Sequence, residues 1–299
     1  MKLTNDLFKI DAAKTAEVAS EFIKKEVKEL GRDGIVVSMS GGLDSSVVAS
    51  LCVKACGTDN VVGLMLPERQ GNPEAEIYAK QAAAFLGIKA KKINISRNLR
   101  AIGTYRAAIS YIPTKKLRDF VAKKFMSSSN DNFLLENLKG SKTKLMRNAA
   151  ASIYSKQRIR AVVLYKFAEE NNLLVVGAAH LTEDLVGLFV KFGIDDVADV
   201  MPIKKLFRTQ VMQLAEYLEL PKEIAGRKPN PDVIPGIDDK YFGMLGISAD
   251  KIDLLLYGLL HDVSSDDIAS QLDIEKRKVE EVKELIQLSD HMRNPSLAP

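Results

Sequence analysis

The sequence contains few cysteines, and this scarcity excludes whole classes of protein. Among its 299 residues only Cys52 and Cys56 are cysteines, and they lie four positions apart in a predicted helix. Two thiols at that spacing on one helix are poorly placed for a disulfide. No further group of cysteines and histidines completes a zinc site. We therefore interpret both residues as buried thiols of a protein from a reducing compartment.

A long apolar stretch is missing too. No run of about 18 apolar residues is present, which excludes a membrane-spanning helix and a membrane partner. The opening residues, MKLTNDLFKIDAAK, lack the sustained apolar core of a signal peptide, so we expect a cytoplasmic protein. The 43 basic and 39 acidic residues give a net charge of +4 and are scattered along the chain. Such a mild excess suits a polyanionic small molecule as well as a nucleic acid.

Two common phosphate-binding patterns are also absent. No lysine follows the glycines at the Walker spacing, and the G-x-G-x-x-G fingerprint is missing. Present instead is the stretch 34–51, GIVVSMSGGLDSSVVASL, in which an apolar strand leads into a turn that opens a helix. Gly41 and Gly42 have no Cβ atom that would keep an oxyanion from the backbone. A helix start offers free N–H groups and positive potential, so we predict a phosphate cradle at 40–46.

This loop resembles the pyrophosphate-binding loop of the N-type ATP pyrophosphatases through its run Ser40-Gly41-Gly42-Leu43-Asp44-Ser45. Members of that superfamily split ATP to AMP and pyrophosphate while they adenylate a substrate oxygen. The resemblance implies a Rossmann-like fold of the adenine nucleotide hydrolase type. Sulfur transfer onto tRNA or another acceptor is an alternative on the same loop, but it usually needs a catalytic cysteine near the site. Cys52 and Cys56, on the loop helix, are poor candidates for that role.

Hydrophobic patterning predicts an α/β fold, a doubly wound and mostly parallel sheet with helical N- and C-terminal extensions. The first helix is expected at 11–30, with Val18, Phe22 and Val27 among its apolar positions. Besides the loop strand, strands are expected at 61–66, 90–95 and 173–176, and helices at 74–86, 152–170, 208–218, 249–260 and 264–289.

We expect one domain over 1–299, interrupted by a helical insertion at about 96–146 and ending in a helical region at about 249–299. The insertion is rich in Lys, Arg, Ser and Asn, and helices are predicted near 114–125 and 131–139. It is an insertion or a lid of unassigned role.

The segment 264–289 has a helix–turn–helix rhythm, but its second helix is rich in glutamate. An acidic helix favours packing over reading a DNA groove, so we expect no nucleic-acid partner. The segment 227–239 holds three prolines between 229 and 235 and cannot be regular helix or central strand. We interpret it as an ordered loop or a flap.

Polar residues collect after the predicted strand at 173–176. They are His180, Glu183, Lys191, Asp195, Asp196 and Asp199. Open α/β sheets bind ligands at the carboxyl ends of their strands, so these side chains are expected to face the phosphate cradle. By the same reasoning Arg69, in the polar loop after the strand at 61–66, is a candidate phosphate contact.

With this segment included, the chain resembles the ammonia-dependent NAD synthetases over about 10–95 and 150–299. The residues that match the second family signature are Gly177, His180, Glu183, Gly187, Lys191 and Gly193. The resemblance implies ATP-dependent amidation of deamido-NAD to NAD through an acyl-adenylate, with release of pyrophosphate and then AMP. It also implies Mg²⁺ as cofactor, ATP as co-substrate and a homodimer. Nitrogen would come from free ammonia or from a separate glutaminase.

The resemblance also implies roles for single residues. ATP is expected to contact Ser38, Ser40, Gly41, Gly42, Asp44, Ser45, Ser46, Ala178, Arg208 and Asn230, together with Arg69. Deamido-NAD is expected to contact Arg158, Lys191, Asp199, His291 and Met292. Asp44 and Glu183 are expected to hold Mg²⁺, which prefers oxygen ligands. The expected catalytic residues are Asp44, Lys191 and Asp239, the last of which would take a proton from ammonium.

Some positions depart from the family pattern. Ala178 stands for a threonine, Ile194 for an aspartate, Asn230 for a serine or threonine, Met292 for a lysine and Tyr154 for an asparagine. The departures are concentrated at positions expected to hold the second substrate. Two alternatives therefore remain open: a ligase of the same superfamily that acts on a different carboxylate, and a nucleotide-binding protein without turnover.

Overall fold

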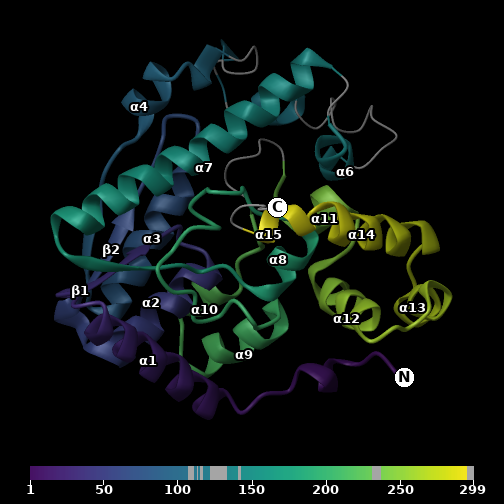
Figure 1. Ribbon diagram of the computed structural model, residues 1–299, viewed down its shortest axis with the longest axis horizontal. Helices are drawn as coiled ribbons and strands as arrows, with labels where there is room; N and C mark the ends of the chain where they lie inside the picture. Colours follow the sequence, from purple (N-terminus) through teal and green to yellow (C-terminus); the bar gives the residue numbers. More distant parts are fainter. Residues whose placement is uncertain are drawn as a thin grey trace, which may run out of the picture.

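A four-stranded parallel sheet forms the centre of the protein (Figure 1). The computed structural model describes residues 1–106, 111–112, 114, 117–121, 133–140, 143–230 and 237–294. Its strands are β1 (Gly34–Ser38), β2 (Val61–Met65), β3 (Lys89–Lys92) and β4 (Leu173–Val176), in the order β3-β2-β1-β4. Helices cover both faces of this sheet, which confirms the predicted doubly wound α/β fold.

The alternation of side chains along β1 explains why both faces are covered. Ile35 and Val37 pack with α1 (Ala12–Glu29) and α2 (Leu43–Cys56) on one face. Val36, between them, packs on the other face against α7 (Lys144–Glu170). Successive side chains of a strand point to opposite faces, so a central strand buried on both sides must be apolar throughout.

The order of the strands fixes where a ligand can enter. From β1 the chain moves outward through α2 to β2 and then through α3 (Pro73–Leu86) to β3, and it later returns to place β4 on the other side of β1. Gly34 of β1 pairs with Leu173 of β4 in parallel register. The direction of winding therefore reverses between these two strands. In open α/β sheets such a switch point opens a crevice beyond the carboxyl ends of the strands.

The buried face of α1 differs from the predicted one. Ala16, Ala19 and Ile23 are buried, whereas Val18 and Phe22 are exposed. Val18 and Phe22 lie one residue off the stripe that meets α2. The small alanines let the two helices approach closely, and the larger apolar side chains remain at the surface.

Strand β3 begins one residue earlier and ends sooner than the predicted 90–95. Beyond β3, the Ile93 amide donates to Met65 O at the end of β2, and the Ile95 amide donates to Pro67 O, two residues further on. The two backbones therefore stay paired past the end of the strand. All four residues of β3 are exposed. Lysines along an edge strand hinder pairing with a further strand.

The predicted insertion contains α4 (Ser96–Ala101), η3 (Thr104–Arg106) and α6 (Phe133–Leu138). Residues 117–121 are helical, while the rest of the helix predicted near 114–125 lies mostly outside the described residues. Helix α7 begins at Lys144, eight residues before the predicted start, because the hydroxyl of Thr143 caps it by accepting from the Met146 amide. The division into domains remains a prediction.

The C-terminal helices contribute to a separate apolar cluster and lie to one side of the sheet (Figure 1). They are α12 (Ala249–Leu260), α13 (Ser265–Leu272) and α14 (Lys276–Leu288), and both α12 and α14 contact α8 (Leu181–Val186). The remaining described elements are η1 (Asn5–Phe8), η2 (Thr58–Asn60), α9 (Arg208–Tyr217), α10 (Lys222–Ala225), α11 (Lys240–Leu245) and α15 (Asp290–Arg293). Helix α14, part of the segment with the helix–turn–helix rhythm, thus packs against α8, which carries candidate site residues.

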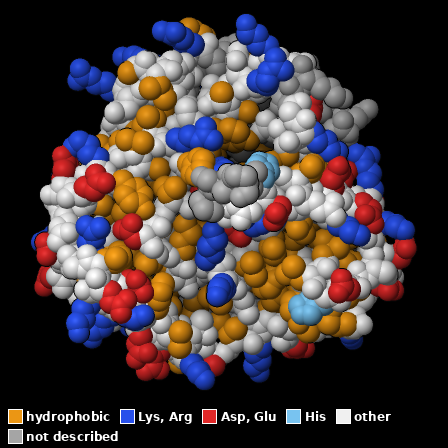
Figure 2. Space-filling view, viewed as in Figure 1, with side chains coloured by type: hydrophobic (Ala, Val, Ile, Leu, Met, Phe, Trp, Pro, Cys, Tyr) orange, Lys and Arg blue, Asp and Glu red, His pale blue; other side chains and the backbone are white. Residues whose placement is uncertain are grey.

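Figure 2 shows lysines and arginines interleaved with acidic and apolar side chains on one face of the molecule.

Within the part of the chain that the structure describes, no helix is both long and apolar enough to cross a membrane. Both cysteines are free thiols, with Cys52 buried and Cys56 partly exposed.

Candidate active site

The loop between β1 and α2 has the shape that the sequence predicts. Gly41 has a φ of +73°, and a Cβ atom there would lie 2.6 Å from Ala75 O and from the Ala79 amide of α3. Gly42 is the N-cap of α2, and it has no side chain to occupy the amides of the first turn. Ser40 Oγ accepts from the Gly42 amide at 3.3 Å and lies 3.1 Å from Ser45 Oγ. The loop thus presents a helix N-terminus without a side-chain cap.

A cavity of about 640 Å³ opens beside this loop, at the carboxyl ends of β1 and β4. The predicted ATP-contacting residues that line it are Ser38, Ser40, Gly42, Asp44, Ser45, Arg69, Ala178, Arg208 and Asn230. Gly41 and Ser46 are not part of its wall. Ser46 is fully buried, and its hydroxyl donates to Gly42 O at 2.8 Å. These two residues therefore shape the loop from behind.

Glycine at the loop is expected to be indispensable. Gly41→Ala would force backbone of α3 and the loop apart, and we expect ATP affinity to fall at least about tenfold, or ~1.4 kcal/mol. The measurement is calorimetric titration of ATP together with a urea unfolding curve.

Gly31→Ala is the matched control for this substitution. Gly31 also has a positive φ, +59°, but no atom lies within 4 Å of the added Cβ. The only expected cost of Gly31→Ala is backbone strain, which should lower the free energy of unfolding by about 1–2 kcal/mol. Equal ATP affinities in the two variants would contradict the steric argument.

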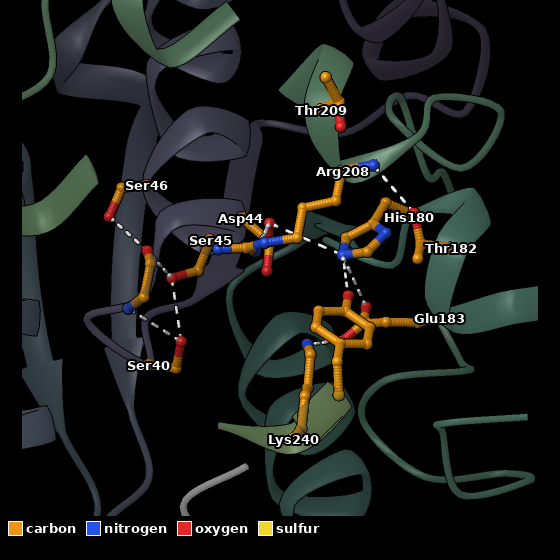
Figure 3. Close-up of polar contacts among 12 residues, drawn as sticks. Ser40, Asp44, Ser45, Ser46, His180, Thr182, Glu183, Arg208, Thr209 and Lys240 are labelled. Carbon is orange, nitrogen blue, oxygen red and sulfur yellow. Dashed lines mark hydrogen bonds and ion pairs between the residues drawn. The ribbon is translucent and has the colours of Figure 1, made fainter. Parts of the chain in front are cut away.

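Charged side chains from four helices meet at the mouth of the cradle (Figure 3). Asp44 lies in the first turn of α2, His180 is the N-cap of α8, and Arg208 begins α9. Arg208 Nη1 is 3.6 Å from Asp44 Oδ1, and Lys240, the first residue of α11, forms an ion pair with Glu183. Burial opposes ionisation of Asp44, but His180, Arg208 and Lys240 outweigh it and lower the pKa of that carboxyl.

Asp44, His180 and Glu183 can bind a divalent cation. One ligand atom from each lies within 4.8 Å of the other two, and Asp44 Oδ1 is a buried atom with no hydrogen-bond partner among the described residues. His180 Nε2 is 3.5 Å from Glu183 Oε2 and 3.9 Å from Asp44 Oδ1. Two carboxylates suit Mg²⁺, which binds proteins through few carboxylate ligands and keeps several waters. The residues present therefore fit such an ion.

Sequence reasoning did not find Lys240. It is 57 residues from Glu183 and directly follows the proline-rich segment, so no spacing connects the two. Its ammonium group nevertheless contacts one of the two carboxylates expected to hold the metal. A bound cation and Lys240 would therefore compete for Glu183.

Lys240→Met is expected to strengthen divalent metal binding because Glu183 loses its competing ammonium partner. We expect about a tenfold lower dissociation constant for Mn²⁺ or Mg²⁺, or ~1.4 kcal/mol, measured by calorimetry without nucleotide. Lys204→Met is the control, since Lys204 pairs with the neighbouring Asp184 at 3.1 Å and neither residue lines the cavity. Unchanged or weaker affinity in Lys240→Met would refute the competition.

Asp195 is a further carboxyl group of the cavity wall. Gln157 Nε2 donates to Asp195 Oδ2 at 2.5 Å. Desolvation and, after it, the charge of Glu183 raise the pKa of Asp195 to about 6. Ile194, which stands where the family has an aspartate, lines the same cavity. Asp195 was expected to face the phosphate cradle, and it is the carboxyl group at this part of the wall.

The Arg69 end of the cavity rests on a buried ion pair. Lys156 Nζ of α7 is 2.9 Å from Glu68 Oε1, and both side chains are buried. Tyr105 O–H donates to Glu68 Oε2 at 2.7 Å, and the Arg69 guanidinium lies 3.9 Å above the centre of the Tyr105 ring. Desolvation would raise the pKa of Glu68, but Lys156 outweighs it and lowers that pKa. Glu68 thereby joins the loop after β2 to α7.

Glu68→Gln would leave the Lys156 ammonium buried without a counter-charge. We expect it to lower the free energy of unfolding by about 3–5 kcal/mol in urea titrations, because an uncompensated buried charge is costly. The double variant E68Q/K156M removes both charges and should recover most of that loss. A single variant as stable as the wild type would show that the pair is not stabilising.

The predicted acceptor-side residues lie apart from the cradle. Arg158 Nε donates to Lys191 O at 3.2 Å, and Lys191 Nζ donates to His291 O at 2.8 Å. Met292 Sδ lies near Gly187, at the end of α8. None of these four predicted residues lines the cavity. They nevertheless gather in one place, although their roles in binding remain predictions.

Two predicted carboxylates have structural partners. Asp199 accepts from the Val175 amide at 2.8 Å and from the Tyr165 hydroxyl at 3.2 Å. Asp239 is the N-cap of α11 and accepts from two amides of its first turn. Neither lines the cavity. Asp239 is thus oriented by the helix that carries Lys240, and its predicted proton transfer is not supported by its position.

Comparison with known proteins gives consistent matches over nearly the whole chain. The family model for NAD synthase matches residues 15–118 and 122–296. A protein named NH(3)-dependent NAD(+) synthetase from Thermotoga maritima is 37% identical over 275 residues, 91% of this chain and 94% of its own length. One of the same name from Methanocaldococcus jannaschii is 34% identical and is covered over 92% of both chains.

Solved structures show the same fold at lower identity. NMN synthetase from Francisella tularensis has a TM-score of 0.71 and 23% identity, covering 97% of this chain and 99% of its own. NH3-dependent NAD synthetase from Campylobacter jejuni, in complex with the nitrate ion, has a TM-score of 0.67 and 24% identity. It covers 97% of this chain and is itself covered completely, at 100%.

Proposed function

The chain belongs to the NAD synthase family, and on that premise we propose that it is a ligase that amidates deamido-NAD to NAD with ammonia. ATP is split to AMP and pyrophosphate in the process. The observation that carries the proposal is the meeting of Asp44, Glu183 and Arg208 at the mouth of the phosphate cradle. Relatives named NH(3)-dependent NAD(+) synthetase support the choice of acceptor and of ammonia.

The first half of the reaction is adenylation. The α2 N-terminus and the loop hydroxyls would bind the pyrophosphate part of ATP, and Arg208 would neutralise charge on it. The nicotinate carboxylate oxygen attacks the α-phosphorus, the bond to the β-phosphate oxygen breaks, and pyrophosphate leaves with that electron pair. The products are an acyl-adenylate and pyrophosphate. No side-chain nucleophile takes part in this step.

Asp44 and Glu183 would hold a divalent cation, which we propose to be Mg²⁺, with His180 beside them. Bound there, it would neutralise phosphate charge that the helix N-terminus alone cannot balance. Lys240 would be displaced from Glu183 toward the phosphates and add a second positive charge. This role for Lys240 follows from its ion pair with the same carboxylate.

The second half is transfer to nitrogen. Ammonia attacks the acyl carbon, the bond to the AMP oxygen breaks, AMP leaves with that electron pair, and the new amide nitrogen releases a proton to water. We assign Asp195 as the acceptor of a proton from ammonium, in place of Asp239, because Asp195 lines the cavity and has a raised pKa of about 6. Free ammonia is the proposed nitrogen source, with a separate glutaminase as the alternative.

The acceptor would extend from the cavity toward Arg158 and His291, where the predicted acceptor-side residues meet. We further propose a homodimer, for which the exposed Val18 and Phe22 of α1 offer apolar surface. A cytoplasmic location remains a prediction.

Asp44→Ala is expected to slow the reaction strongly because it removes both a proposed metal ligand and the partner of Arg208. We expect kcat/KM for pyrophosphate release to fall about 10²–10³-fold, the loss typical of a group that stabilises charge in the transition state. The assay follows pyrophosphate with ATP, deamido-NAD and ammonia, omitting each in turn.

Asp59→Ala, at an exposed carboxylate of η2, is the control and should keep full activity. Pyrophosphate release that needs a different carboxylate would overturn the assigned acceptor. ATP binding without pyrophosphate release, over a panel of carboxylates with ammonia, would overturn the enzyme assignment.

A further inference from the structure

A fully buried carboxylate outside the cavity holds the elements of the active site together. Asp253 lies in α12 with none of its surface exposed, and it does not line the cavity. Its Oδ1 accepts from the Thr182 hydroxyl at 2.6 Å. Its Oδ2 accepts from both the amide and the hydroxyl of Thr209, at 2.7 Å and 2.6 Å. The side chain thus binds two different helices at once.

The two helices are those that carry the candidate catalytic groups. Thr182 precedes Glu183 in α8, and Thr209 follows Arg208 in α9. Thr182 Oγ1 also accepts from the Arg208 amide at 2.9 Å (Figure 3). Its hydroxyl therefore links Asp253 to the backbone of Arg208. A single network therefore connects the residues next to both groups.

Helix α9 depends on this network for its N-terminus. Its N-cap residue is Phe207, whose side chain cannot accept a hydrogen bond, and the first turn leaves backbone amides without intrahelical partners. The amides of Arg208 and Thr209 are bound instead by Thr182 and by Asp253 from distant parts of the sequence. Asp253 performs for α9 the function that a capping Ser or Asp usually performs from the N-cap position itself.

We propose that Asp253 is a positioning residue that, through Thr182 and Thr209, sets the separation of Glu183 and Arg208. Residue Glu183 would hold the metal and Arg208 the phosphates, so the proposal rests on the proposed function. The network is well defined because Asp253 and Thr182 are fully buried and each of their side-chain oxygens is hydrogen-bonded. A displacement of about 1 Å at a catalytic group is enough to slow a reaction about a hundredfold.

Thr182→Val tests the link. The buried carboxylate of Asp253 keeps its two hydrogen bonds from Thr209 in this variant. Valine keeps the shape of threonine and removes the hydroxyl, while Thr182→Ser keeps the hydroxyl. We expect kcat for pyrophosphate release to fall at least about tenfold in Thr182→Val, with Mn²⁺ affinity reduced several-fold. Thr182→Ser should stay within about twofold of the wild type. Asp253→Asn is a second variant. Where it folds, we expect its kcat and its Mn²⁺ affinity to be lower than those of Thr182→Val.

Ile252→Val is the matched control. Ile252 is a fully buried neighbour of Asp253 on α12 and takes part in none of these hydrogen bonds. Loss of one buried methyl group should lower the melting temperature by about 2–4 °C. We expect a comparable decrease in Thr182→Val. We expect turnover and metal affinity to remain those of the wild type.

The measurements separate the outcomes. Metal affinity by calorimetry, pyrophosphate release and thermal unfolding are followed for all variants of the full chain. Wild-type turnover and metal affinity in Thr182→Val would overturn the proposal, as would equal losses in Thr182→Val and Ile252→Val. A wild type that is inactive with deamido-NAD and ammonia would overturn the proposed function alone. Weaker Mn²⁺ binding in Thr182→Val, restored by serine, would still support the positioning role.

Discussion

Charge balance beyond the carboxyl ends of β1 and β4 is the constraint on which the site depends. Asp44 and Glu183 bring two carboxylates within 4.8 Å of each other. Like charges at about 5 Å repel by roughly 3 kcal/mol at an effective dielectric constant near 20. The arrangement therefore requires cations, and Arg208 and Lys240 supply them from α9 and α11. Each cation contacts one carboxylate, so the site is neutralised in pairs that a phosphate or a metal can exchange.

The C-terminal helices have a direct part in this balance. They form their own apolar cluster, yet α12 reaches α8 and α9 through Asp253, and the segment before them supplies Lys240. A phosphate-binding sheet alone would hold Asp44 but would leave Glu183 and Arg208 on helices without a common support. Helix α14, from the segment that in sequence resembled a DNA-binding motif, packs against α8 and so supports the helix that carries Glu183.

Local patterns predicted the sheet and the loop because their determinants are local. A short apolar run predicts β1, and glycines before a helix predict the cradle; the bounds of β4 were predicted without error. Lys240 and Asp253 could not be predicted in the same way, because their partners are far away in sequence and neither belongs to a recognisable spacing. Val18 and Phe22 were misinterpreted for another reason: helical periodicity predicts an apolar stripe but not which of two adjacent stripes packs against α2. Asp195 was expected to face the cradle, but its raised pKa depends on burial and on the nearby charge of Glu183, which the sequence does not show.

The position of β4 in the chain has a consequence for synthesis on the ribosome. Strand β1 is central, but its pairing with β4 must wait until residues beyond 173 have emerged. Until then Ile35, Val36 and Val37 belong to an open apolar edge, the kind of surface that pairs with other chains. Closing so long a loop is also slow, since non-local contacts reduce folding rates. The emerging chain is therefore most exposed to aggregation while it still lacks the strand that creates its binding crevice.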